Sequence, residues 1–174
     1  MALDERDRRL ARVTAATVLG RWEALAELRR GAPRGEPDRA WREALLQTHL
    51  FAGFPRLVEA YAVLDAAGGL GELDRDEARA EPDQPQRGFE LFGRIYGPAA
   101  AGLRDKLARQ HPDFGAWVLG HAYGRVLARP GLAPERREIL ACVALAALGQ
   151  ERQLAGHLRG ALACGAPRAA LEQA

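Results

Sequence analysis

Residues 135–168 read ERREILACVALAALGQERQLAGHLRGALACGAPR, and this stretch predicts two helices joined by a turn. Pro134 stands where a helix commonly begins, and the apolar residues after it recur at helical spacing. Gly149 interrupts that pattern before a second helical stretch, which leads to Gly165. The stretch therefore predicts a helical hairpin.

The hairpin places Glu138 and His157 where their side chains can meet. Glu138 lies eleven residues before Gly149, and His157 lies eight residues after it. With a rise of ~1.5 Å per residue, antiparallel packing leaves the two residues about 4 to 5 Å apart in height. Gln150 and Gln153 share a helix face with His157 because the three fall at i, i+3 and i+7. The sequence thus predicts a carboxylate, an imidazole and two amides close together.

The motif HLRGAL at residues 157–162, with Arg137 and Glu138 upstream, resembles the carboxymuconolactone decarboxylase and alkylhydroperoxidase D-like superfamily. Residues 123–132 and 46–56 carry further parts of the resemblance. The resemblance implies a multi-helical bundle of two degenerate alkylhydroperoxidase D-like helical-hairpin halves. It also implies a homo-oligomer.

Composition independently predicts an all-α protein. Alanine, leucine and arginine dominate, and aromatic residues make up only 6% of the chain. The 25 basic and 23 acidic residues are spread along the sequence, which argues against nucleic-acid binding. No apolar run approaches the ~20 residues that span a bilayer, and the charged start lacks the apolar core of a signal peptide. We therefore expect a cytoplasmic protein without membrane or nucleic-acid partners.

The N-terminal region matches the hairpin at a constant offset of 129 residues, at which Gly20 pairs with Gly149 and Gly31 with Gly160. An internal repeat explains these matches, although a composition rich in Ala, Leu and Arg also produces matches by chance. If the repeat is real, the first copy has lost the carboxylate, the imidazole and the two amides of the second copy. The residues that replace Glu138, Gln150, Gln153 and His157 there are Arg9, Arg21, Ala24 and Leu28.

The repeat predicts three parts. Residues 1–67 form a degenerate N-terminal half-domain, residues 68–87 a linker, and residues 88–174 the C-terminal half with the Glu and His. The linker is rich in Gly, Pro and charged residues, and we expect Pro82 and Pro85 to prevent a regular helix there. Elsewhere the sequence predicts helix caps at Asp4, Asp38 and Asp113 and a helix break at residues 53–55.

The resemblance offers two chemistries. The peroxidase branch needs a redox Cys-x-x-Cys, whose positions are held here by Gln150 and Gln153, so a thiol peroxidase is not expected. Cys142 and Cys164 fit buried, reduced thiols. The decarboxylase branch uses neither metal nor organic cofactor and moves protons with the histidine that corresponds to His157.

The decarboxylase reading leads to a lyase hypothesis with named roles. His157 is the candidate acid or base, and Glu138 orients it. Many family members carry an acidic residue where this chain has Gln153, which puts the specific muconolactone reaction in doubt. Gln150, Gln153, His49 and Arg159 are the candidate substrate contacts, and Arg137 and Arg152 are further candidates for holding an anion.

A non-catalytic binding or assembly protein is the alternative. In that reading Glu138 and His157 merely join two helices, and His49 lies at the edge of the core. The expected partners are then further copies of the chain, with a small-molecule substrate or none. His111 and His121 fit structural roles, whereas Tyr123 could offer a hydroxyl to the site.

Overall fold

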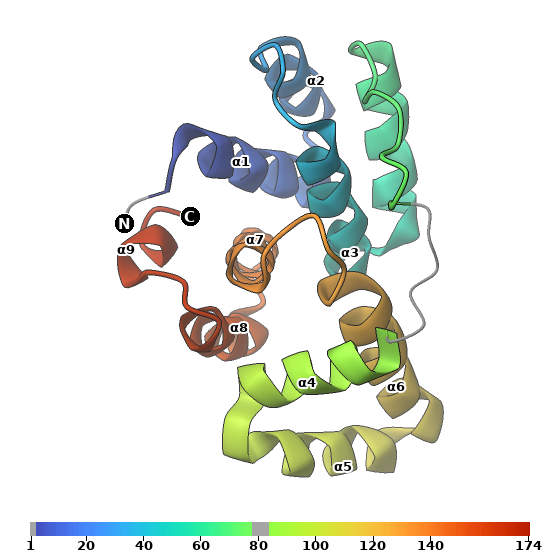
Figure 1. The fold of residues 1–174 in the computed structure, drawn as a ribbon, viewed down its shortest axis with the longest axis vertical. Coiled ribbons are helices and arrows are strands. Elements are labelled where there is room, and N and C mark those ends of the chain that lie inside the picture. The colour runs from blue at the N-terminus through green and yellow to red at the C-terminus, as the bar shows by residue number, and fades with distance from the viewer. Residues whose placement is uncertain (1–2, 78–83) are drawn as a thin grey trace.

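The computed structural model describes residues 3–77 and 84–174, and helices are the only regular elements in those ranges (Figure 1). The predicted all-α class is confirmed. The elements are α1 (Glu5–Leu19), α2 (Trp22–Arg30), α3 (Asp38–Ala66), α4 (Gln84–Tyr96), the 3₁₀ helix η1 (Gly97–Ala99), α5 (Ala100–Gln110), α6 (Pro112–Ala116), the π-helix η2 (Trp117–Leu127), α7 (Pro134–Ala147), α8 (Glu151–Ala163) and α9 (Arg168–Leu171).

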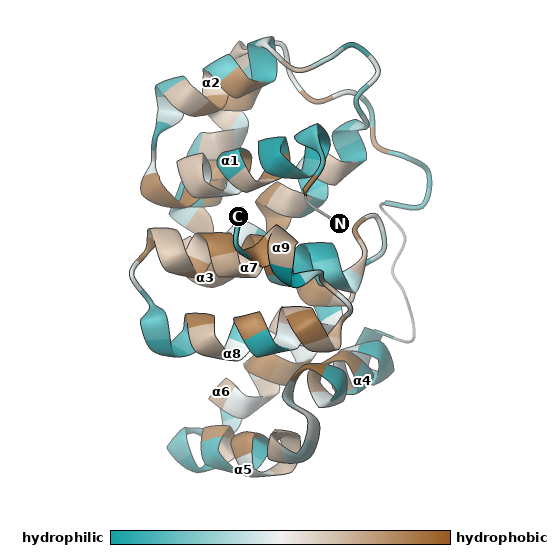
Figure 2. Cartoon of the chain, turned by 90° about the vertical axis from the view of Figure 1, so that its left-hand side faces the viewer, coloured by the Kyte–Doolittle hydropathy of each residue, from teal (hydrophilic) through white to brown (hydrophobic). Residues whose placement is uncertain are grey.

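Helix α7 lies in the middle of the bundle, where it packs against α1, α3, α8 and α9 (Figure 1). Pro134 is its first residue, as predicted, and its residues 137–145 are all buried. Figure 2 shows that the layer around α3, α7 and α9 is mainly hydrophobic, whereas α1 carries several hydrophilic turns. No helix among the described residues has both the length and the apolarity to cross a membrane.

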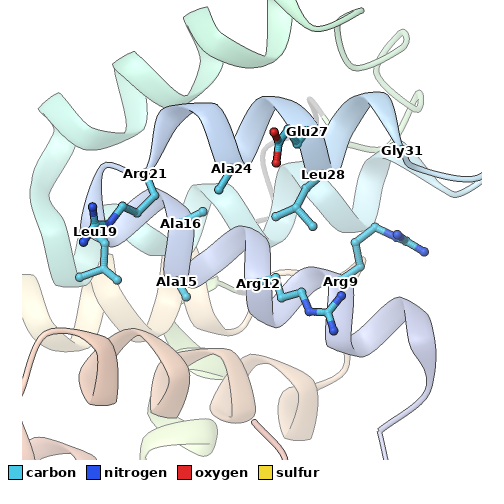
Figure 3. A pocket seen from close by; sticks show the side chains of 10 residues that line it. All are labelled: Arg9, Arg12, Ala15, Ala16, Leu19, Arg21, Ala24, Glu27, Leu28 and Gly31. Carbon is cyan, nitrogen blue, oxygen red and sulfur yellow. The ribbon is translucent and has the colours of Figure 1, made fainter.

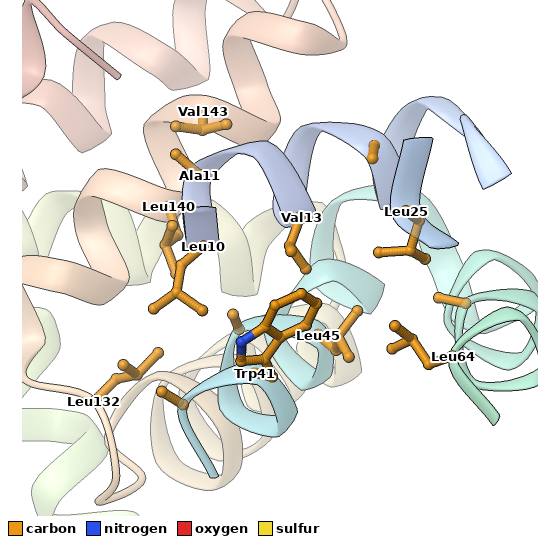
Figure 4. Close-up of a cluster of buried hydrophobic side chains, with 14 of the residues drawn as sticks. Leu10, Ala11, Val13, Leu25, Trp41, Leu45, Leu64, Leu132, Leu140 and Val143 are labelled. Atoms are coloured by element: carbon orange, nitrogen blue, oxygen red, sulfur yellow. The ribbon is translucent and has the colours of Figure 1, made fainter. Parts of the chain in front are cut away.

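One cluster of buried side chains joins the two ends of the chain. Trp41 of α3 is fully buried at its centre, with Leu10 and Val13 of α1 beside it (Figure 4). Leu140 and Val143 of α7 complete the same cluster. The N-terminal helices therefore share their core with the C-terminal hairpin.

The turns of the two hairpins have the same backbone geometry. Gly20 and Gly149 both adopt the left-handed conformation, with φ of 66° and 65°. The next residues, Arg21 and Gln150, each donate a backbone hydrogen bond of 2.8 Å to the carbonyl five residues earlier. An internal repeat at an offset of 129 residues predicts this agreement, and the duplication itself stays a prediction.

One of the three predicted caps is confirmed. The carboxylate of Asp4 accepts a 2.7 Å hydrogen bond from the backbone N–H of Asp7. The prediction for Asp38 was wrong, because its carboxylate instead accepts hydrogen bonds from the loop N–H of Gly71 and from Arg29.

The predicted cap at Asp113 was also wrong. His111 is the N-cap of α6, and its Nδ1 accepts the backbone N–H of Asp113 at 3.1 Å. Pro112 follows as the first helical residue, so the helix begins two residues earlier than an Asp113 cap would allow.

Glycine and proline mark the remaining irregularities. Gly53 has φ of 80° inside α3, so the predicted helix break is confirmed as a kink. Within the predicted linker, Pro82 lies outside the described residues. The expectation that Pro85 prevents a helix was wrong, since Pro85 is part of α4, in the first turn that is described.

Candidate functional site

Glu138 and His157 form a hydrogen-bonded pair between α7 and α8. The Nδ1 atom of His157 lies 2.9 Å from the Oε2 atom of Glu138. Glu138 is 1% exposed, and the side chain of His157 is 12% exposed. The contact predicted from the hairpin spacing is therefore confirmed.

The outer atoms of this pair are unpaired within the described residues. Glu138 Oε1 is buried without a hydrogen-bond partner. His157 bonds through Nδ1 alone, which leaves its Nε2 without a protein partner in the same part of the chain. A buried carboxylate oxygen without a partner costs about 1–3 kcal/mol or more, so Oε1 is a strong acceptor for a water or ligand hydroxyl.

Small and apolar neighbours frame the pair. The ring of Phe51, from α3, meets the His157 ring edge-on with centroids 6.1 Å apart. A Cβ added at Gly160 would lie 2.7 Å from Glu138 Oε2 and 2.7 Å from a methyl carbon of Ile95. Gly160 therefore leaves the space through which Glu138 reaches His157. The glycine of the HLRGAL motif has a packing role.

Two tyrosines lie near this carboxylate. The hydroxyls of Tyr96 and Tyr123 are 2.8 Å apart. Burial raises the pKa of Tyr123 well above its usual value, and the charges of Tyr96 and Glu138 add to the effect. Burial also raises the pKa of Tyr96. Both hydroxyls stay neutral near pH 7, and the Tyr123 hydroxyl, a candidate for the site, is bonded to Tyr96.

The structure does not bring the other predicted contacts onto the pair. Gln150, Gln153 and Arg159 are exposed, and none is hydrogen-bonded to Glu138 or His157 in the described ranges. Gln153 lies one turn before His157 on the same helix, so it borders the approach to the imidazole.

His49 takes part in a separate histidine pair. Its Nε2 lies 2.8 Å from Nε2 of His121, and its Nδ1 bonds the backbone carbonyl of Leu46. Its ring also stacks on Phe54 with a centroid distance of 4.7 Å. Burial, followed by the nearby charge of His49, lowers the pKa of His121. One of the two imidazoles must be neutral to accept the shared hydrogen bond.

Arg137 belongs to a buried ion network, and the expectation that it could hold a substrate was wrong. Its Nη2 lies 2.7 Å from Glu43 Oε2, and both side chains are at most 1% exposed. Arg129 also bonds Glu43, and the guanidinium of Arg137 donates to the backbone carbonyls of Arg129 and Pro130. The guanidinium of Arg137 therefore holds α7 against α3 and is not directed at a substrate.

The two cysteines are buried and free. Burial raises the pKa of Cys142 to about 12, and burial also raises the pKa of Cys164. Such thiols are protonated near pH 7 and are poor nucleophiles. The described residues hold no group of three or more His, Cys, Asp or Glu side chains suited to a metal ion.

The sequence reasoning missed three neighbours of the pair. Phe51 lies within residues 46–56, which carry part of the family resemblance, so a signal for it existed. Ile95 and Tyr96 come from α4 and carry no such signal, because their position depends on how α4 packs against α8.

Comparison with known proteins gives a family and two relatives. Residues 112–174 match the model of the carboxymuconolactone decarboxylase family. Peroxisomal protein 2 of Schizosaccharomyces pombe is 29% identical over 132 residues, which are 73% of this chain and 61% of the relative. Peroxisomal protein 2 of Saccharomyces cerevisiae is 24% identical over 160 residues, or 76% of this chain and 56% of the relative.

The chain thus spans less than two thirds of the length of both relatives. The family match covers α7 and α8 entirely, together with α6, η2 and α9. The segment that carries Glu138 and His157 is therefore similar to the carboxymuconolactone decarboxylase family, as its sequence resemblance predicted.

Proposed function

We propose that Glu138 and His157 are an acid–base dyad that acts on a small carboxylate or lactone without a metal or organic cofactor. The observation that carries the proposal is the 2.9 Å contact between Glu138 Oε2 and His157 Nδ1, combined with an Nε2 that has no protein partner among the described residues. A carboxylate that accepts from one ring nitrogen fixes the tautomer and orientation, so the other nitrogen is directed at a substrate.

The name of the matched family suggests the reaction, which is the decarboxylation of a carboxylated lactone. In such a step the carbon–carbon bond to the carboxylate breaks and its electron pair moves into the conjugated lactone. Carbon dioxide leaves, and a ring carbon of the resulting lactone dienolate takes a proton from Nε2 of the protonated imidazole. Glu138 stabilises the imidazolium before the transfer, and solvent restores the proton afterwards.

Arg159 binds the carboxylate of the anionic substrate. Burial raises the pKa of Tyr96 most, and of the two charges that act on the same hydroxyl, Glu138 raises this pKa and Arg159 lowers it. Arg159 is exposed and can turn toward a ligand beside His157. Gln150 and Gln153 lie on the same helix as further polar contacts. His49 is bonded to His121 and remains the weakest of the proposed contacts.

Turnover of 4-carboxymuconolactone tests the proposal, with carbon dioxide release as the readout. We expect His157→Ala to abolish release and Glu138→Gln to lower it about 10²-fold or more, because general acid–base catalysis contributes on that scale. His111→Asn is the matched control, since it removes a distant histidine and keeps an N-cap. Undiminished release by His157→Ala would refute the dyad.

A non-catalytic assembly protein is the second candidate. It is favoured by the exposure of Gln150, Gln153 and Arg159, since none of them is bonded to the dyad in the described residues. The Glu138–His157 bond would then serve only to hold α7 against α8. Absence of carbon dioxide release by the wild type, together with a loss of self-association in His157→Ala, would support it.

Assembly and location complete the proposal. We expect a homo-oligomer, in line with the family resemblance, and light scattering at high concentration would contradict this if it gave the mass of a monomer. The cytoplasm is the proposed compartment, whereas the names of both relatives point to the peroxisome as the alternative. A fluorescent fusion to the whole natural protein separates the two.

A further inference from the structure

A groove of about 520 Å³ runs between α1 and α2, away from the dyad (Figure 3). Its middle is formed by small or apolar side chains, and arginines lie toward its ends (Figure 3). The residues that line it are Arg9, Arg12, Ala15, Ala16, Leu19, Arg21, Ala24, Glu27, Leu28 and Gly31.

The groove occupies the place in the first hairpin that the dyad occupies in the second. At the offset of 129 residues, Arg9 corresponds to Glu138 and Leu28 to His157. Arg21 and Ala24 correspond to the two glutamines. Among the described residues, no hydrogen bond joins a side chain of α1 to one of α2 as Glu138 joins α7 to His157 of α8, so this space stays open. Arg9 is held instead by Glu36, with its Nε 3.0 Å from the carboxylate.

Small side chains keep this space from being filled. Ala15 and Ala16 of α1 face Ala24 of α2, and none of these extends beyond a methyl group (Figure 3). Leu28 adds an apolar wall and Leu19, 42% exposed, borders the turn. Desolvation of these surfaces favours a ligand with a hydrocarbon body.

The charge of the groove selects an anion. Its lining contains three arginines and one glutamate. Arg9 is neutralised by Glu36. Arg12 and Arg21 are exposed, and in the described part of the chain neither side chain makes a hydrogen bond or ion pair. Two guanidinium groups therefore remain available, and a carboxylate matches their paired donors.

We propose that this groove is a second binding site, separate from the dyad, for an organic carboxylate with an apolar chain. The apolar chain of the ligand lies along Ala15, Ala24 and Leu28, and its carboxylate binds the guanidinium of Arg12 or Arg21. The volume falls within the ~300–1,000 Å³ that is usual for small-molecule sites. If the repeat is real, the first hairpin has lost an acid–base pair and gained an anion site at the same position.

Octanoate is the probe, and its binding is measured by isothermal titration calorimetry, with 1-octanol as the neutral control of equal chain length. We expect octanoate to bind more tightly than octanol. The double variant Arg12→Gln/Arg21→Gln should weaken octanoate binding by about tenfold or more, because it removes the charge-assisted hydrogen bonds. Arg109→Gln, which removes an exposed arginine from α5, should leave it unchanged.

Two further variants locate the site. Ala24→Trp fills the groove from an exposed position and should abolish octanoate binding, with circular dichroism showing that the helices remain. His157→Ala should bind octanoate as the wild type does, which separates this site from the dyad.

Three results would overturn the proposal. The first is an octanoate affinity that is unmeasurable in the wild type or unaffected by the arginine substitutions. The second is equal affinity for octanol and octanoate. The third is an oligomer that dissociates when Arg12 and Arg21 are replaced, because a second copy of the chain would then occupy the groove.

Discussion

Gly160 of α8 faces Glu138 of α7 so closely that a methyl group at position 160 would lie 2.7 Å from Glu138 Oε2. The same methyl group would meet Ile95 of α4 at 2.7 Å. The absence of a side chain at one residue thus sets the position of the carboxylate that orients His157. Gly160 is a positioning residue in the proposed site.

Gly160→Ala should displace Glu138 and weaken its bond to His157. Overpacking of this kind costs about 1–3 kcal/mol, and urea unfolding measures it. Gly156→Ala is the matched control on the same helix, because nothing lies within 4 Å of a Cβ added there. That control should stabilise the protein by up to about 1 kcal/mol through helix propensity. Equal stability of the two variants would contradict the close packing.

The tautomer of His157 offers a test of the dyad that needs no substrate. With Glu138 Oε2 as acceptor, the neutral imidazole should carry its proton on Nδ1, and nitrogen-15 chemical shifts of the ring report this directly. Glu138→Gln removes the charged acceptor and should shift the population toward the Nε2-protonated form. A wild-type ring protonated mainly on Nε2 would rule out the orienting role of Glu138.

The buried network of Glu43 and Arg137 should make a large contribution to stability. Arg137→Ala leaves Glu43 buried beside Arg129 alone, and breaking a buried pair costs about 3–5 kcal/mol. Arg136→Ala is the control, because Arg136 is 35% exposed and pairs with Asp7 at the surface. Chemical denaturation measures the loss of unfolding free energy in both variants. A loss below about 1 kcal/mol for Arg137→Ala would mean that the network is not a structural unit.

The histidine pair predicts a loss of stability in mild acid. The pKa of His121 is lowered from its ordinary value of 6.5 in the folded protein, so the unfolded chain binds the proton first. Stability is therefore complete above pH ~6.5 and falls as the pH drops through that value toward the folded pKa of His121. His121→Gln should flatten the pH dependence of the melting temperature in this window. An unchanged slope would show that other groups cause it.

The buried thiols should be unreactive in the folded protein. Burial raises the pKa of Cys142 to about 12 and raises that of Cys164 as well, so almost no thiolate is present at pH 8. We expect Ellman's reagent to modify neither cysteine in native buffer and both in concentrated urea. Rapid modification of either one without denaturant would reopen a thiol-based chemistry.

The hairpin of α7 and α8 was predictable because its signals are local. Pro134, Gly149 and the helical spacing fix where the two helices begin and turn, and the spacing of Glu138 and His157 follows from helix geometry. The kink at Gly53 was predictable for the same reason.

Contacts between distant segments were not predictable in this way. Arg137 forms its ion pair with Glu43, which lies 94 positions away in the sequence. The local sequence around Arg137 therefore did not indicate that this arginine has a structural role. The carboxylate of Asp38 likewise bonds Arg29 and the Gly71 loop instead of capping its own helix, because a charged partner was within reach. The packing of α4 that brings Ile95 toward Glu138 carries no local signal either.

The shared core of Trp41, Leu140 and Val143 has a consequence for folding during synthesis. Helices α1 to α3 leave the ribosome about 70 residues before α7, at a synthesis rate of ~5–20 residues per second. Until then the indole of Trp41 lacks the helix that covers it. The apolar surface around Trp41 therefore stays partly uncovered for several seconds. Because the core is completed by contacts of long sequence separation, folding should be slower than in a helical protein with mainly local contacts.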